Sequence, residues 1–232
     1  MIVLGIETAT AQVGCAIGGV EGVFASFQVA RGRRHAELLV PAISSVCQAA
    51  QVELGEIGVV AVDIGPGLFT GLRVGIATAK SMASALRVPV IGLSSLDLLA
   101  HQVRHSSRLI VPVIDAKRGE IFSATYRHVQ GGIQRLTEAR VGSPDELAND
   151  LRAQRQESLL VGDGALRYAG VLAEDSGMVE LGTVGMQWPS AADLVELAHP
   201  RALREEFVQP WELQPLYLRK SDAEINWDAR KV

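Results

Sequence analysis

The sequence predicts an α/β fold built from two related units, and three observations carry this prediction. A nearly all-apolar run, residues 58–64, passes through a glycine-rich turn into a helix-period segment. Strand-length and helix-length apolar segments alternate through the first half of the chain. The pattern of Val3–Ile17, a strand, an acidic turn and a second strand, recurs 108 residues later in Val111–Thr125. With 232 residues, 48% of them hydrophobic, the chain can bury one large core or two moderate ones, and its length favours two.

The first half predicts three strands, a helix, a strand, a helix, a short strand and a helix. Glycines 18, 19 and 22 provide the first hairpin turn, and apolar residues recur at helical spacing from His35 to Ala50. Ser94 or Ser95 is the expected N-cap of the last helix, which runs to about Val103. The expected elements before it are Ile2–Glu7, Val13–Ile17, Val23–Val29, His35–Ala50, Gly58–Ile64, Thr70–Leu86 and Val90–Gly92.

The second half predicts fewer helices. After the repeated unit we expect a strand over Ile133–Val141 and a helix capped at Ser143, with Pro144 in its first turn. A strand, Ser158–Val161, ends in a Gly-Asp-Gly turn, and a last helix runs from Ser190 to about Leu197.

The turn within Asp63–Gly75 is the most informative segment. Its glycines permit close backbone approach, and the helix start that follows presents free N–H groups, which often bind an anion. The spacing fits neither the dinucleotide fingerprint nor a P-loop, and a turn without any ligand is the alternative interpretation.

Composition excludes several classes. A net charge of −4 and a pI near 5.8 argue against a dedicated nucleic-acid-binding domain. Cys15 and Cys47 each lie in an apolar run, so we expect buried free thiols. No apolar run is long enough to span a membrane and no signal sequence is evident, which predicts a cytoplasmic protein.

Several segments in the right order resemble one family, bacterial TsaB (YeaZ), over most of the chain. They are Ile2–Thr10, Arg34–Pro41, the glycine turn with the helix and strand after it, Asp115–Glu120 and Pro215–Arg219. Glu7 stands where the family usually carries Asp. The resemblance implies the actin, sugar-kinase and Hsp70-like (ASKHA) fold, duplicated, with a reduced second domain. The expected division is an N-terminal domain over residues 1–106, a C-terminal domain over 107–219 and a polar tail over 220–232.

The resemblance also implies a non-catalytic partner of TsaD in threonylcarbamoyl transfer to the adenosine beside the anticodon of tRNAs that read codons starting with A. The ATPase TsaE and tRNA would join through the complex, and the chain alone would form a homodimer. Pairing would use the helices His35–Ala50 and Thr70–Leu86. The second is apolar nearly all round, with Val74, Ala77, Thr78, Ser81 and Ala85 as a small-residue stripe. Which of Leu39 and Leu72 points outward stays open. The predicted partner-binding residues are His35, Leu38, Leu39, Ala42, Ile43, Phe69, Leu72, Arg73 and Ile76.

An enzyme is the alternative. Kinases of this superfamily use carboxylates in the cleft between the two domains. A nucleotide-binding phosphotransferase would use the acidic turn at Glu7 and Thr8 and the acidic turn at Asp115. Gly162 and Gly164 would form its adenosine-binding turn. We expect no catalytic residue and no cofactor, although a nucleotide in the cleft or at a complex interface is left open.

No metal is expected in this chain, and the purified chain should carry no stoichiometric transition metal. The reason lies at the position that the catalytic sister family uses for its metal. Two histidines four residues apart bind the metal there, and this chain has Ser95 and Leu99 instead. His101 nearby is interpreted as a surface or capping residue, and His35 as structural or interfacial. No serine-hydrolase elbow surrounds Ser94 and Ser95. Arg31, Arg33 and Arg34 form the only concentrated basic patch and are the candidate RNA contacts, with a solvated loop as the alternative.

Overall fold

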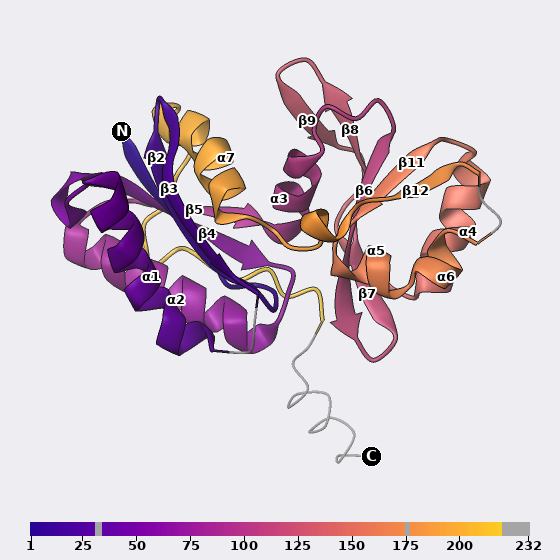
Figure 1. The fold of residues 1–232 in the computed structure, drawn as a ribbon, viewed down its shortest axis with the longest axis horizontal. Helices are drawn as coiled ribbons and strands as arrows, with labels where there is room; N and C mark the ends of the chain where they lie inside the picture. Colours follow the sequence, from indigo (N-terminus) through magenta and orange to yellow (C-terminus); the bar gives the residue numbers. More distant parts are fainter. Residues whose placement is uncertain (31–33, 175–176, 220–232) are drawn as a thin grey trace, which may run out of the picture.

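The structure is a computed structural model that describes residues 1–30, 34–174 and 177–219. Two mixed β-sheets lie side by side, each with helices on both faces (Figure 1). The first sheet has the strand order β3-β2-β1-β4-β5, and the second has the main path β10-β7-β6-β11-β12. Each sheet therefore places its first strand between an antiparallel neighbour and a parallel one.

This shared order confirms the predicted duplicated α/β fold. In both units the first strand forms a hairpin with the next strand and a parallel pair with a later one. Helical segments make the crossovers to the parallel strands. The second unit is the reduced one, because the short helices α5 and α6 stand where the first unit has the 18-residue α2.

The first sheet carries α1 and α2 on one face and α7 on the other (Figure 1). Its residues are continuously buried along the central strands, as expected of strands covered on both faces. The elements of this half are β1 (Ile2–Glu7), β2 (Val13–Gly19), β3 (Gly22–Val29), α1 (His35–Ala50), η1 (Leu54–Glu56), β4 (Ile57–Gly65), α2 (Phe69–Leu86), β5 (Val90–Ser94) and α3 (Ser95–Gln102).

The second sheet carries α3 on one face and α4, α5 and α6 on the other. The hairpin of β8 and β9 pairs with the start of β6 and projects beyond the sheet (Figure 1). The elements of this half are β6 (Leu109–Lys117), β7 (Glu120–Ser123), β8 (Tyr126–Val129), β9 (Gly132–Arg135), β10 (Arg140–Gly142), α4 (Pro144–Gln154), β11 (Ser158–Val161), α5 (Asp163–Arg167), α6 (Ala169–Leu172), β12 (Val179–Leu181), η2 (Val184–Met186) and α7 (Ala191–Leu203).

The chain crosses back to the first sheet at its end. Helix α7 packs Leu194, Val195 and Ala198 against β1 and β2, and it also contacts α3. The expected division at residue 107 stays a prediction. From α7 onward the chain lies on the first sheet, where Val208 bridges Val90 of β5 and Leu213 enters the core. The α3–α7 contact therefore joins the two halves.

Local sequence signals explain most helix starts. Ser94 accepts a hydrogen bond from the Leu96 N–H at the start of α3, and Ser143 forms a capping box with Glu146 at the start of α4. Three expectations are corrected. The expected strand 133–141 is two strands, because residues 136–139 leave the ladder. Helix α7 continues to Leu203, and Asp163 begins a short helix rather than a plain turn.

Cys15 and Cys47 are buried, as predicted. Burial and the neighbouring Cys47 raise the pKa of the Cys15 thiol to about 12, so it stays protonated at neutral pH. Among the described residues, no helix combines the length and apolar character needed to cross a membrane.

Candidate functional site

The glycine-rich turn packs against the end of the first strand. A Cβ added at Gly67 would overlap the carbonyl oxygen of Ala9, and one added at Gly71 would overlap that of Thr8. The Leu68 N–H donates to the Ala9 carbonyl at 2.6 Å, and the Thr8 hydroxyl donates to the Gly71 carbonyl at 2.8 Å. The glycines therefore do allow a close backbone approach, as predicted, but what approaches them is the chain's own β1–β2 turn. This contact holds α2 against that turn.

A pair of carboxyl groups lies beneath this turn. Glu7 and Asp63 are both 0% exposed. Burial, together with the charge of Asp63 and a hydrogen bond to it, raises the pKa of Glu7 well above its usual range, and burial also raises the pKa of Asp63. Glu7 Oε1 accepts from the Ala9 N–H, and Asp63 Oδ1 accepts from Gly65 and Ser95, each at 2.7 Å. Glu7 Oε2 and Asp63 Oδ2 are buried with no hydrogen-bond partner among the described residues, and we expect one proton shared by the two carboxyl groups to satisfy them.

The predicted cleft residues are therefore not one open site. Glu7 and Thr8 do not line a cleft, because both are wholly buried beneath α2, which corrects that expectation. A Cβ at Gly162 would overlap the Val113 carbonyl, and one at Gly164 would lie 2.9 Å from the Asp115 nitrogen, so both glycines also allow close packing. Their role in holding adenosine stays a prediction.

Asp115 alone of the two turn carboxylates adjoins an open pocket. Burial raises the pKa of Asp115, but the hydrogen bonds and charge of Lys117 outweigh burial and hold it below its ordinary value. Lys117 Nζ lies 2.6 Å from Asp115 Oδ2. Behind this pair, burial raises the pKa of Asp163 to about 6, and its Oδ1 accepts from the Asp115 N–H at 3.0 Å. The ion pair with Lys117 therefore favours the ionised form of the Asp115 carboxylate.

A pocket of about 330 Å³ lies between the two sheets, beside Asp115. The start of α2 forms one wall and residues 216–219 form another. Phe69 stacks on Tyr217 with ring centroids 5.4 Å apart, and the Arg73 guanidinium lies 3.8 Å from the Phe69 ring centre. Both predicted partner residues in this group, Phe69 and Arg73, are thus engaged by the chain's own Tyr217.

The second surface of interest is the outer face of α1 and α2. A shallow groove of about 550 Å³ runs between the two helices. Helices α1 and α2 lie in the lower left of Figure 1. Glu37 is the only Asp, Glu, Lys or Arg in the 16 residues of α1, and Arg73 and Lys80 are the only ones in the 18 residues of α2. A charge-poor helical face is typical of protein interfaces. The groove is lined by Val40, Ile43, Ser44, Cys47, Leu54, Ala77, Thr78, Ser81 and Met82.

Most of the predicted partner-binding residues lie beneath this face. Leu39 and Leu72 are each 1% exposed and fill the chain's own core, so the expectation that one of them points outward is wrong. His35 is buried and its Nε2 lies 2.8 Å from the Thr10 carbonyl oxygen, which gives it a structural role. Ala42, Ile43 and Ile76 are buried as well, and Leu38 is half-buried.

The residues that the structure exposes on this face are their neighbours in sequence. Val40 is 64% exposed, and Ala77 and Ser81 of the small-residue stripe are exposed too. The small-residue stripe of α2 was the feature of the sequence that could have identified this exposed face. Helical spacing gives the interval between residues on one face but not the direction in which that face points.

The sister family's metal-binding positions hold internal contacts. Ser95 is 0% exposed and donates to Asp63 at 2.7 Å, and Leu99 lies in the core. His101 is neither a surface nor a capping residue, because it is buried and its Nδ1 lies 2.9 Å from Asp193 of α7. Of the predicted RNA contacts, Arg31 and Arg33 lie outside the described residues. Arg34 is exposed and pairs with Glu37 at 2.6 Å.

Comparisons with known proteins agree with this architecture. Residues 28–227 match the family described as TsaD: tRNA N6-adenosine threonylcarbamoyltransferase. The tRNA threonylcarbamoyladenosine biosynthesis protein TsaB of Bacillus subtilis is 26% identical, over 98% of both chains. The protein of the same name from Escherichia coli is 28% identical, over 96% of both.

Solved structures with a similar fold include a YeaZ protein. YeaZ from Pseudomonas aeruginosa superposes with a TM-score of 0.81 and 26% identity, covering 94% of this chain and 99% of that one. The ethanolamine utilization protein EutJ from Carboxydothermus hydrogenoformans has a TM-score of 0.53 at 10% identity, which shows a shared fold alone.

Proposed function

The chain belongs to the TsaB family, and from that premise we propose that it is a non-catalytic partner of TsaD in the formation of N6-threonylcarbamoyladenosine in tRNA. In this proposal TsaD transfers the threonylcarbamoyl group to the adenosine beside the anticodon of tRNAs that read codons starting with A. The chain holds TsaD in its competent conformation, and TsaE and tRNA join through the complex. Without TsaD the chain pairs with a second copy of itself in the cytoplasm.

The observation that carries the proposal is the charge-poor outer face of α1 and α2. It combines an apolar groove with an exposed Val40, and small side chains on α2 allow another helix to approach closely. Two helices from a partner, laid against α1 and α2, would complete a four-helix arrangement with the groove at its centre.

A separate observation supports the non-catalytic part. A phosphotransferase of this superfamily needs carboxylates that can reach a metal–nucleotide complex, and Glu7 is sealed beneath α2 and hydrogen-bonded to Asp63. Among the described residues, Asp115 is the only carboxylate that lines the pocket between the sheets, and it is paired there with Lys117. The phosphotransferase alternative therefore lacks an accessible second carboxylate in this structure.

Reconstitution tests the proposal. Transfer of the threonylcarbamoyl group to tRNA is measured with TsaD and TsaE, with and without this chain, and the chain is also tested alone with threonylcarbamoyl adenylate and with ATP. We expect transfer only when TsaD and this chain are both present. Turnover of either substrate by the chain alone, or full transfer without it, would contradict the proposal.

A further inference from the structure

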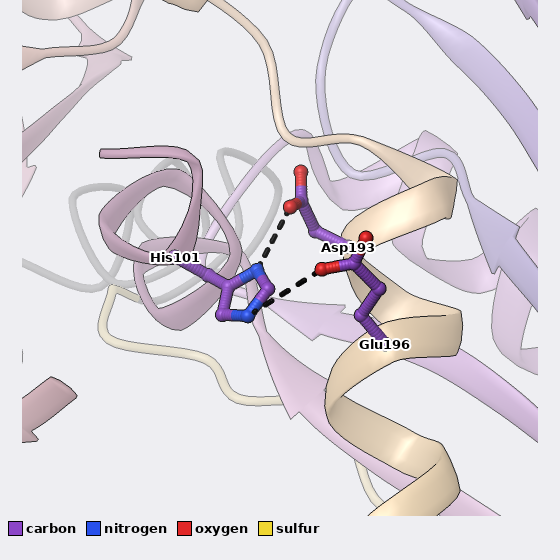
Figure 2. Close-up of side chains that lie close together, drawn as sticks. All are labelled: His101, Asp193 and Glu196. Atoms are coloured by element: carbon purple, nitrogen blue, oxygen red, sulfur yellow. Dashed lines mark hydrogen bonds and ion pairs between the residues drawn. The ribbon is translucent and has the colours of Figure 1, made fainter. Parts of the chain in front are cut away.

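Three polar side chains meet where the two halves of the chain touch. Figure 2 shows the His101 ring of α3 between the carboxylates of Asp193 and Glu196, which lie on neighbouring turns of α7. His101 Nδ1 is 2.9 Å from Asp193 Oδ1, and His101 Nε2 is 3.8 Å from Glu196 Oε2. One ligand atom from each residue falls within a span of 4.8 Å.

The contact with Asp193 fixes the orientation and tautomer of the ring. An ionised carboxylate only accepts hydrogen bonds, so the 2.9 Å contact requires a proton on His101 Nδ1. Arg104 Nη1 lies 3.4 Å from the same nitrogen and, as a donor, cannot share it with that proton. In the neutral ring the lone pair is therefore on Nε2, which is the carboxylate–histidine arrangement that second-shell groups impose on metal-binding imidazoles.

His101 Nε2 has no hydrogen bond among the described residues. The side chain is only 9% exposed, and the ring lines a cavity of about 750 Å³ between α3, α7 and the β8–β9 hairpin. The separation of 3.8 Å from Glu196 Oε2 is too long for a hydrogen bond. In a tetrahedral zinc site two ligands, each about 2.0–2.2 Å from the metal, lie about 3.4 Å apart, so a closing movement of about 0.4 Å would let one ion bridge His101 and Glu196.

We propose that His101 and Glu196 form a binding site for a divalent transition ion of the zinc type, with Asp193 as a positioning residue. Imidazole and carboxylate are ligands that zinc accepts, and water from the cavity would complete its coordination. The ion would join α3 to α7 and so clamp the two halves together. This proposal departs from the expectation that the chain carries no metal, which was argued from Ser95 and Leu99 and not from the contact between α3 and α7.

Arg104 is the competing cation at this site. Its Nη2 lies 3.2 Å from Glu196 Oε2, so a bound ion must displace this half-exposed ion pair. Neutralising Arg104 removes both the competition and a like charge beside the ion. Arg104→Gln should therefore tighten metal binding. If these residues form only an ion-pair network, the same change would remove an ion pair and give no tighter metal binding.

Zinc titration of the untagged full-length chain, by calorimetry after treatment with a chelator, tests the site. We expect one zinc per chain, a loss of about tenfold or more in affinity for His101→Gln and Glu196→Gln, and a loss of about 10–100-fold for Asp193→Asn. His105→Gln, an exposed histidine lining the same cavity, is the matched control and should bind as the wild type does. Arg104→Gln should bind more tightly.

Zinc should also raise the melting temperature of the wild type and not that of His101→Gln, because binding to the folded state alone stabilises it. Circular dichroism checks the fold of each variant. If His101→Gln does not fold, the half-exposed Glu196 supplies the decisive variant. No saturable zinc binding by the wild type, equal binding by Glu196→Gln, or loss of binding with His105→Gln would overturn the proposal.

Discussion

The carboxyl groups of Glu7 and Asp63 form one buried, hydrogen-bonded pair at the centre of the first unit. Glu7 ends β1 and Asp63 lies near the end of the neighbouring parallel strand β4, so the fold itself brings them together. Two ionised carboxylates in such a site would repel each other without solvent to screen them, which is why one proton is retained. The pair joins the β1–β2 turn to the glycine-rich turn.

This pair predicts a pH dependence of stability. The folded pKa values of Glu7 and Asp63 lie above their ordinary values of 4.5 and 3.8, so the folded state keeps a proton that the unfolded state loses. Stability from the pair is complete below about pH 4 and falls as the pH rises towards the folded pKa, by about 1.4 kcal/mol for each unit of raised pKa. Glu7→Gln can still accept from Ala9 and can donate to Asp63. Its free energy of unfolding should fall less between pH 5 and 8 than that of the wild type, by urea denaturation.

Glu21→Gln is the control, because Glu21 is an exposed acid in the first hairpin turn. It should follow the wild-type pH curve. Parallel curves for wild type and Glu7→Gln would contradict the shared-proton assignment.

The glycine contacts predict a cost for adding a single methyl group. Gly71→Ala would drive a Cβ into the Thr8 carbonyl, which is backbone and cannot rotate away. We expect a loss of about 1–3 kcal/mol or more in the free energy of unfolding. At Gly170, in a short helix, an added Cβ meets nothing within 4 Å, so Gly170→Ala should leave stability unchanged or raise it by about 0.5–1 kcal/mol. Equal stability of the two variants would show that α2 is not seated on the β1–β2 turn through Gly71.

The regular elements of the first unit could be predicted because each has a clear local period. Helix α1 has the predicted bounds, and Ser94 and Ser143 cap the helices expected to follow them. The contact between His101 and Asp193 could not be predicted, because the residues are 92 positions apart and meet only when α7 returns to the first sheet. The direction of Leu72 was equally inaccessible, since α2 is almost wholly apolar and has no polar side to orient it.

The corrected orientation of Leu39 changes what its substitution should do. Its side chain is 1% exposed in the core between α1 and the first sheet. Leu39→Ala should lower the free energy of unfolding by about 2–5 kcal/mol through lost packing and a cavity. In conditions where the variant is folded, its affinity for TsaD should be unchanged. A folded, fully stable Leu39→Ala that no longer associates would place this residue on the surface instead.

If the outer face of α1 and α2 is the pairing surface, Val40→Glu should abolish pairing. Val40 is 64% exposed, so the change should leave the melting temperature of the isolated chain unaltered. In a complex it would bury an unpaired carboxylate at a cost of about 2–4 kcal/mol, or about 30- to 1,000-fold in affinity. Val20→Glu, at a position 81% exposed in the first hairpin turn, is the matched control. Calorimetric titration with TsaD, and light scattering of the chain alone, should show that Val40→Glu loses both associations while Val20→Glu retains them. Wild-type association by a folded Val40→Glu would show that the outer face of α1 and α2 is not the pairing surface.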